Sequence, residues 1–177
     1  MFDIDVSYRH FPLHPDTPEG GLTLDELFAG RNIDIPAAQT RMLRLMAEEG
    51  LPYGTRTMTY KSRLAQELGK WAETRPEGEE IHDALFQAYF VDNVNLAMIE
   101  NLIKIAERVG LPAEEAERVL TERQYRDAVD ADWQRSRALG ITGVPTFVIG
   151  DRGLVGAQPY EQLEAFVSSA GSARHDT

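Results

Sequence analysis

Few side chains in this sequence could do chemistry, and the histidines are the first to consider. His10 and His14 are four residues apart, a spacing that on a helix would bring two imidazoles to one metal ion. The prolines between and after them break any helix, so both belong to a loop and are better interpreted as surface or packing residues. His82 stands near the start of a helical stretch and has no nearby partner in the sequence. The sequence therefore predicts no metal site.

Covalent catalysis has no candidate residue either. The 177 residues contain no cysteine, which excludes disulfides, thiolate catalysis and thiolate metal ligands within the chain. Ser7, Ser62 and Tyr60 have no neighbouring base that would activate a hydroxyl. No glycine-rich loop follows a predicted strand, so nucleotide binding lacks support. We therefore assign no catalytic residue.

The candidate binding site is the stretch Gly143, Val144, Pro145 and Thr146. It leads into the apolar run that ends at Ile149, which we expect to be a strand. Proline has no N–H to give to a sheet and so suits the first position of a strand. An X-Pro bond at such an entry can be cis, although only about 5–6% of X-Pro bonds in folded proteins are.

Charge and composition limit the partners that this loop could serve. Eighteen basic and 29 acidic side chains give a formal net charge of −11, which argues against nucleic acid and anionic membrane surfaces. No apolar run approaches the roughly 20 residues of a membrane helix, and the N-terminus has no apolar signal core. We therefore expect a cytoplasmic protein with no nucleic-acid partner and no membrane partner.

The elements that must position the loop are predicted to be a strand, a long helical block, two strands and a final helix. Residues 4–9 alternate apolar and polar side chains, which predicts a strand. Thr23 and Glu26 have the spacing of a capping box and predict the start of a short helix. A long helical block follows, with stretches at 62–74, 79–91, 95–109 and from 113 to about 139, the last broken near Thr121. A strand at 145–149, a turn at 150–153, a strand at 154–157 and a helix after Pro159 complete the order.

This order resembles the thioredoxin fold with a helical insertion, as in the DsbA family of thiol–disulfide oxidoreductases. The sequence is most similar to the FrnE-like and 2-hydroxychromene-2-carboxylate isomerase-like branch. Three stretches carry the resemblance: 8–15, 62–71 and 139–149 with 156–159. The resemblance implies an α/β class, with a mixed thioredoxin-like sheet and a large all-helical insertion at about 62–139. We expect one domain over 1–177, with a polar tail at 171–177. It also implies a cis bond before Pro145.

One departure from the family matters for function. Family members carry a first strand and a first helix before the strand expected here at 4–9, and their redox cysteine or serine opens that helix. Here the first strand and first helix of the fold are absent, and the chain has no cysteine. We expect an N-terminal truncation of a redox enzyme. The strand at 4–9 then either pairs directly with 145–149, leaves a slot beside it, or has the slot filled by a second copy in a homodimer.

Three functions remain open from the sequence. The resemblance implies a disulfide oxidoreductase that acts on a protein disulfide or thiol. The alternatives are a glutathione-dependent isomerase or transferase relative, and a thiol-free peptide-binding module. No cofactor is expected, with glutathione as a ligand or co-substrate in the second case. In each case the backbone of Val144 would pair with an extended peptide or glutathione by strand addition.

Overall fold

The computed structural model describes residue 2 and residues 4–170, so the predicted polar tail lies outside the described residues. The chain divides into two compact units. We call His14–Val129 the helical unit, and Met1–Leu13 together with Asp130–Thr177 the terminal unit. Each unit is considered by itself below. No described helix is long and apolar enough to cross a membrane.

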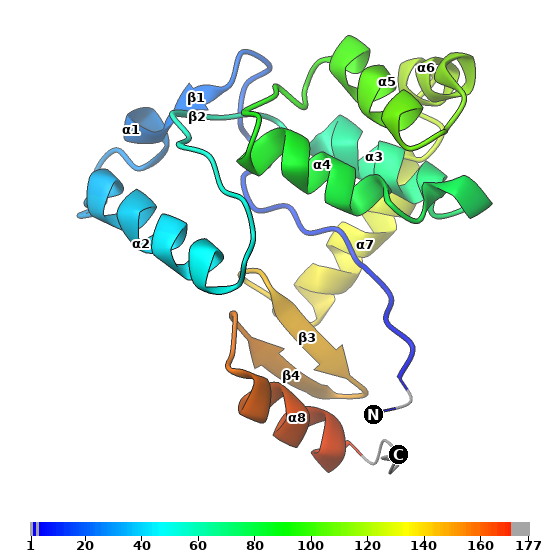
Figure 1. The fold of residues 1–177 in the computed structure, drawn as a ribbon. Coiled ribbons are helices and arrows are strands. Elements are labelled where there is room, and N and C mark those ends of the chain that lie inside the picture. The colour runs from blue at the N-terminus through cyan, green and yellow to red at the C-terminus, as the bar shows by residue number, and fades with distance from the viewer. Residues whose placement is uncertain (1, 3, 171–177) are drawn as a thin grey trace. The chain divides into compact units, whose positions relative to one another are not determined.

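The helical unit is built around four helices that pack on one another, as Figure 1 shows in green. They are α3 (Arg63–Ala72), α4 (Ile81–Phe90), α5 (Ile99–Arg108) and α6 (Ala113–Thr121), with a short 3₁₀ turn η1 (Pro76–Gly78) before α4. The helical stretch predicted at 62–74 is confirmed by α3, in which Leu68 and Trp71 are almost completely buried. The predicted break near Thr121 is also confirmed. The fully buried side chains of these helices form one core.

The first part of the helical unit is less buried. It contains β1 (Leu22–Thr23), α1 (Leu24–Leu27), α2 (Ile35–Glu48) and β2 (Met58–Thr59). The capping box is confirmed, because the Glu26 amide donates to Thr23 Oγ1 at 3.1 Å and the Thr23 amide donates to Glu26 Oε2 at 2.8 Å. The antiparallel pair of β1 and β2 was not predicted, since two-residue strands leave no periodic pattern.

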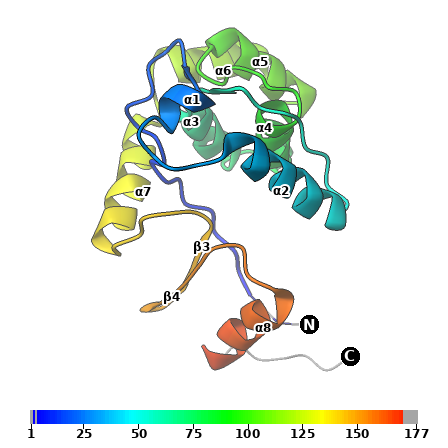
Figure 2. The ribbon, with the colours of Figure 1, turned by 90° about the vertical axis from the view of Figure 1, so that its left-hand side faces the viewer.

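The terminal unit contains most of α7 (Arg126–Ala138), β3 (Thr146–Ile149), β4 (Arg152–Val155) and α8 (Tyr160–Ser169). The strands form an antiparallel hairpin in which Ile149 lies opposite Arg152 (Figure 2). The predicted four-residue turn is therefore wrong. Only Gly150 and Asp151 connect the strands, and Gly150 has a φ of 62°, which suits a tight two-residue hairpin. The returning strand begins two residues earlier than expected.

The predicted strand at 4–9 does not form. Residues 4–9 lack strand hydrogen bonding, and Ile4, Val6 and Tyr8 are 47%, 69% and 62% exposed. β3 belongs to a sheet of two strands, so direct pairing of 4–9 with 145–149 does not occur in the described structure. The alternating pattern at 4–9 suits a strand, but a strand needs a neighbour to satisfy its backbone groups.

Candidate functional site

The loop before β3 is held at both ends and open in its middle. The Val144–Pro145 peptide bond is cis. Thr146 Oγ1 donates to the Gly143 carbonyl at 2.8 Å, and the Gly156 amide donates to the Pro145 carbonyl at 2.8 Å. Between these contacts Val144 is 52% exposed, and its amide and carbonyl make no hydrogen bond within the described residues. The loop therefore presents the free N–H and C=O of one residue, Val144, between two fixed neighbours.

The free edge of β3 continues this open backbone. Residues of an antiparallel pair alternate between positions bonded to the partner and positions whose N–H and C=O point away. The bond from Gly156 to Pro145 fixes the alternation, so Phe147 and Ile149 face β4. Thr146 and Val148 then direct their backbone groups to the other edge, in line with Val144. No described strand covers that edge.

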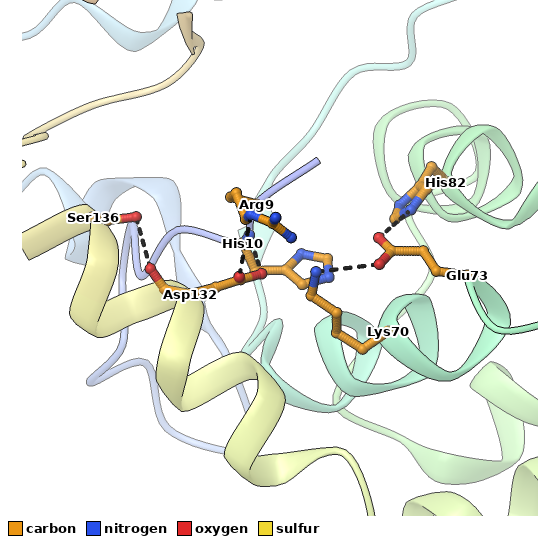
Figure 3. Close-up of polar contacts among 7 residues, drawn as sticks. All are labelled: Arg9, His10, Lys70, Glu73, His82, Asp132 and Ser136. Carbon is orange, nitrogen blue, oxygen red and sulfur yellow. Dashed lines mark hydrogen bonds and ion pairs between the residues drawn. The ribbon is translucent and has the colours of Figure 1, made fainter. Parts of the chain in front are cut away.

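Two further polar clusters surround histidines, each within one unit (Figure 3). In the terminal unit the His10 amide donates to Asp132 Oδ2 at 3.0 Å, and Arg9 Nε lies 3.8 Å from Asp132 Oδ1. Asp132 is only 6% exposed, and its carbonyl accepts from Ser136 Oγ at 3.0 Å. Asp132 thus attaches the N-terminal segment to α7. The loop-packing interpretation of His10 did not identify this acid, because 122 residues separate the two.

The second cluster joins Lys70, Glu73 and His82 in the helical unit. Lys70 Nζ lies 3.2 Å from Glu73 Oε2, and His82 Nε2 lies 3.1 Å from Glu73 Oε1 (Figure 3). His82, for which the sequence offered no nearby partner, therefore has one in Glu73. The packing of α4 on α3 brings it to Glu73, a contact across nine residues that the sequence pattern did not indicate.

Glu67 lies at the centre of a buried ionic cluster in the helical unit. Its side chain is fully buried and accepts from Arg63 Nε at 2.8 Å, Arg123 Nε at 2.7 Å and Arg123 Nη2 at 2.6 Å. Burial raises the pKa of Glu67, but the hydrogen bonds from Arg123 and Arg63 outweigh it and hold the pKa below its ordinary value. Arg63 Nη2 also donates to the Arg126 carbonyl at 2.7 Å. This cluster fixes the turn between α6 and α7 and is structural.

The described residues contain no group of three metal-binding side chains. With no cysteine in the chain, the open loop cannot itself exchange a disulfide.

Comparisons with known proteins show which family the chain is similar to. The sequence model of the family described as "DSBA-like thioredoxin domain" matches residues 2–168. The uncharacterized protein YwbO of Bacillus subtilis is 34% identical over 106 residues, or 59% of this chain. That stretch is 53% of YwbO, so the chain spans about half the length of this curated relative.

Solved structures give the same family. A probable DsbA oxidoreductase from Streptomyces coelicolor is 30% identical, with a TM-score of 0.80 over 93% of this chain and 74% of that chain. Two more distant structures share the fold alone. A 2-hydroxychromene-2-carboxylate isomerase is 16% identical, with a TM-score of 0.63 over 83% of this chain and 74% of its own. The cytosolic disulfide reductase DsbM of Pseudomonas aeruginosa, solved with GSH, is 20% identical, with a TM-score of 0.55 over 77% and 76%.

Proposed function

Because the chain belongs to the DSBA-like thioredoxin domain family, we propose that it is the partner-binding part of a thiol–disulfide oxidoreductase. Its fold is the DsbA-like thioredoxin fold, and related structures include an oxidoreductase. The reactive thiols would come from protein outside these 177 residues, since the chain has no cysteine. The protein would act in the cytoplasm, as the distant relative DsbM does by its description.

One observation carries the proposal. Val144 is half exposed, and its free amide and carbonyl stand in line with the open edge of β3. An extended peptide that pairs with Val144, Thr146 and Val148 would gain main-chain hydrogen bonds without any change in the hairpin. The loop Gly143, Val144, Pro145 and Thr146 is thus the proposed substrate-binding site.

In this proposal the chain binds the substrate, and a segment outside the 177 residues supplies the thiols. A thiolate on the supplied segment attacks one sulfur of the bound disulfide, and the second substrate sulfur leaves as a thiolate. The mixed disulfide is resolved when a second thiol of the supplied segment attacks it, which releases the reduced substrate and leaves the segment oxidised. The present chain holds the extended substrate during both steps and exchanges no electrons itself.

Glutathione is the second candidate partner. It is a short extended peptide, and the distant relative DsbM was solved with GSH. A glutathione-dependent isomerase or transferase would use the same loop with a serine or cysteine outside these residues. A thiol-free peptide-binding module and a homodimer in which a second copy covers β3 are the remaining alternatives.

Backbone NMR can test the binding site with controls built into the strand. An extended disulfide peptide should shift the amide signals of Val144, Thr146 and Val148, whose N–H groups face the open edge. The amides of Phe147 and Ile149, bonded to β4, should shift less. Equal shifts at all five positions, or none, would contradict strand addition.

A reductase assay tests the source of the thiols. The 177-residue chain should reduce no disulfide, whereas a longer form that carries a Cys-x-x-Cys segment ahead of it should do so. Turnover by the cysteine-free chain alone would overturn the proposal. Binding of reduced glutathione to the longer form without reductase activity would favour the glutathione alternative.

A further inference from the structure

Arg56, in the helical unit, has a side chain fixed in an unusual setting. Its guanidinium carbon lies 4.5 Å from the centre of the Tyr89 ring and 5.4 Å from that of Phe90. Arg56 Nη2 donates to Tyr89 Oη at 3.0 Å, and Tyr89 Oη lies 3.0 Å from Thr59 Oγ1. The Arg56 carbonyl accepts from Gln39 Nε2 at 2.6 Å. Ring stacking and hydrogen bonds therefore hold both the backbone and the side chain.

Most of the donors on this guanidinium remain unused. A guanidinium has five N–H groups, and only the one to Tyr89 has a partner in the described structure. Arg56 Nε is buried and makes no hydrogen bond. No carboxylate among the described residues forms an ion pair with Arg56, although Arg44, Arg75 and Arg118 all have one. In a chain with 29 acidic and 18 basic side chains, an unpaired, partly buried arginine is unexpected.

The charges of Arg56 and of a second arginine, Arg31, both act on His14. Burial first, and then the charges of Arg31 and Arg56, lower the pKa of His14. The imidazole of His14 is therefore uncharged at neutral pH, and the positive charge here comes from the two arginines. Arg31 is exposed and has no ion-pair partner among the described residues. The two arginines thus bring positive charge to the surroundings of His14 without an ion-pair partner among the described residues.

We propose that Arg56, assisted by Arg31 and beside the uncharged His14, forms a binding site for the carboxylate of a small organic acid. The planar guanidinium of Arg56, fixed against Tyr89 and Phe90, matches the two oxygens of a carboxylate. Phe90 also lies 6.1 Å from the rings of both Tyr53 and Phe86, and Phe86 is 58% exposed. These rings offer an apolar surface beside the charge, which suits an acid with a flat apolar group. The site is independent of the loop before Pro145 and of any thiol.

Benzoate and benzamide are the probes, because they share a ring and differ in charge. Isothermal titration of the full chain at neutral pH should detect benzoate and not benzamide. Arg56→Gln should weaken benzoate binding about tenfold or more, since it removes a charged hydrogen bond. Arg31→Gln should weaken it about two- to threefold, because its exposed charge is screened. Arg44→Gln, at an exposed arginine paired with Glu48, should leave binding unchanged.

Several outcomes would overturn this site. Equal binding of benzamide would show that the rings alone bind, and phosphate binding as tight as benzoate would remove the preference for a carboxylate. An equal loss in Arg44→Gln would show general charge attraction. If Arg56→Gln fails to fold, Arg31→Gln decides, because its side chain is exposed; unchanged binding in that variant would contradict the site. Reductase activity is no part of these readouts, so they stand apart from the proposed function.

Discussion

The two units differ sharply in how they treat apolar side chains. Every buried apolar residue in the described structure belongs to the helical unit, from Leu24 to Val129. In the terminal unit the buried side chains are polar, Asp132 and Ser136, while strand residues such as Phe147 and Val155 are 40% and 60% exposed. One unit thus has a closed core and the other does not.

This contrast bears on the proposed binding site at β3. Four helices can satisfy their own backbone and bury their apolar faces on one another. A two-stranded hairpin leaves one edge of each strand unpaired and is only marginally stable in water. The open edge of β3, next to the exposed Val144, is therefore also the place where an added strand would stabilise the chain most.

Removing a buried charge should give the largest difference in stability loss between the two units. Glu67→Gln should destabilise the helical unit by about 3–5 kcal/mol, because Arg63 and Arg123 would lose their carboxylate partner. Asp132→Asn in the terminal unit should cost about 1 kcal/mol, since the His10 amide keeps an acceptor and Arg9 is exposed. Urea unfolding measures both, and equal costs would contradict the contrast.

Shortening a buried apolar side chain should give the next largest difference in stability loss between the two units. Leu68→Ala removes a fully buried side chain and should cost about 2–5 kcal/mol. Val148→Ala, 37% exposed on β3, should cost less than about 1 kcal/mol.

Fluorescence can assign that loss to one unit. Each unit contains one tryptophan, so the Trp133→Phe background leaves Trp71 as the sole reporter of the helical core. Val148→Ala should leave the Trp71 transition in place, whereas a shift as large as that of Leu68→Ala would mean that the hairpin supports the helical core.

The sequence predicted best what depends on local pattern. The helical stretches between 62 and 139, the capping box of Thr23 and the break near Thr121 follow from local sequence, and all three are confirmed. The strand at 4–9 is wrong, because alternation shows which residues suit a strand but not whether a neighbouring strand exists.

The candidate sites divide in the same way. The loop at Gly143–Thr146 was found from a local motif and a family resemblance, and its role in binding stays a prediction. Arg56 and Asp132 were missed because their partners are distant in sequence, at Tyr89 and His10. The one signal that could have suggested Arg56 is an arginine in a loop that has no acidic residue next to it.

Replacing one glycine in each unit by alanine tests the difference in packing between the units with a smaller change in side-chain volume. A Cβ at Gly78 would overlap the backbone of Ala72, whose carbonyl carbon lies 2.6 Å and Cα 2.9 Å from it. Gly78→Ala should therefore cost about 1–3 kcal/mol. A Cβ at Gly153 on β4 would meet only the Phe147 carbonyl at 3.9 Å, so Gly153→Ala should stay within about 0.5 kcal/mol of the original. Thermal melting compares them, and equal losses would show that the hairpin is packed as tightly as the helices.

The smallest expected effect is the response of the helical unit to acid. The folded-state pKa of Glu67 lies below its ordinary value of 4.5, so between these two values the unfolded chain binds more protons than the folded one. The stability that Glu67 contributes is therefore complete above the ordinary value and is lost as the pH falls through the folded-state pKa. Its share of the slope cannot exceed about 1.4 kcal/mol per pH unit. Glu67→Gln should flatten the Trp71-reported stability below pH 4.5, while Asp132→Asn should leave that dependence as it is. A slope that survives in Glu67→Gln would place the acid sensitivity of the helical unit on other carboxylates, and the clamp by Arg63 and Arg123 would then not account for it.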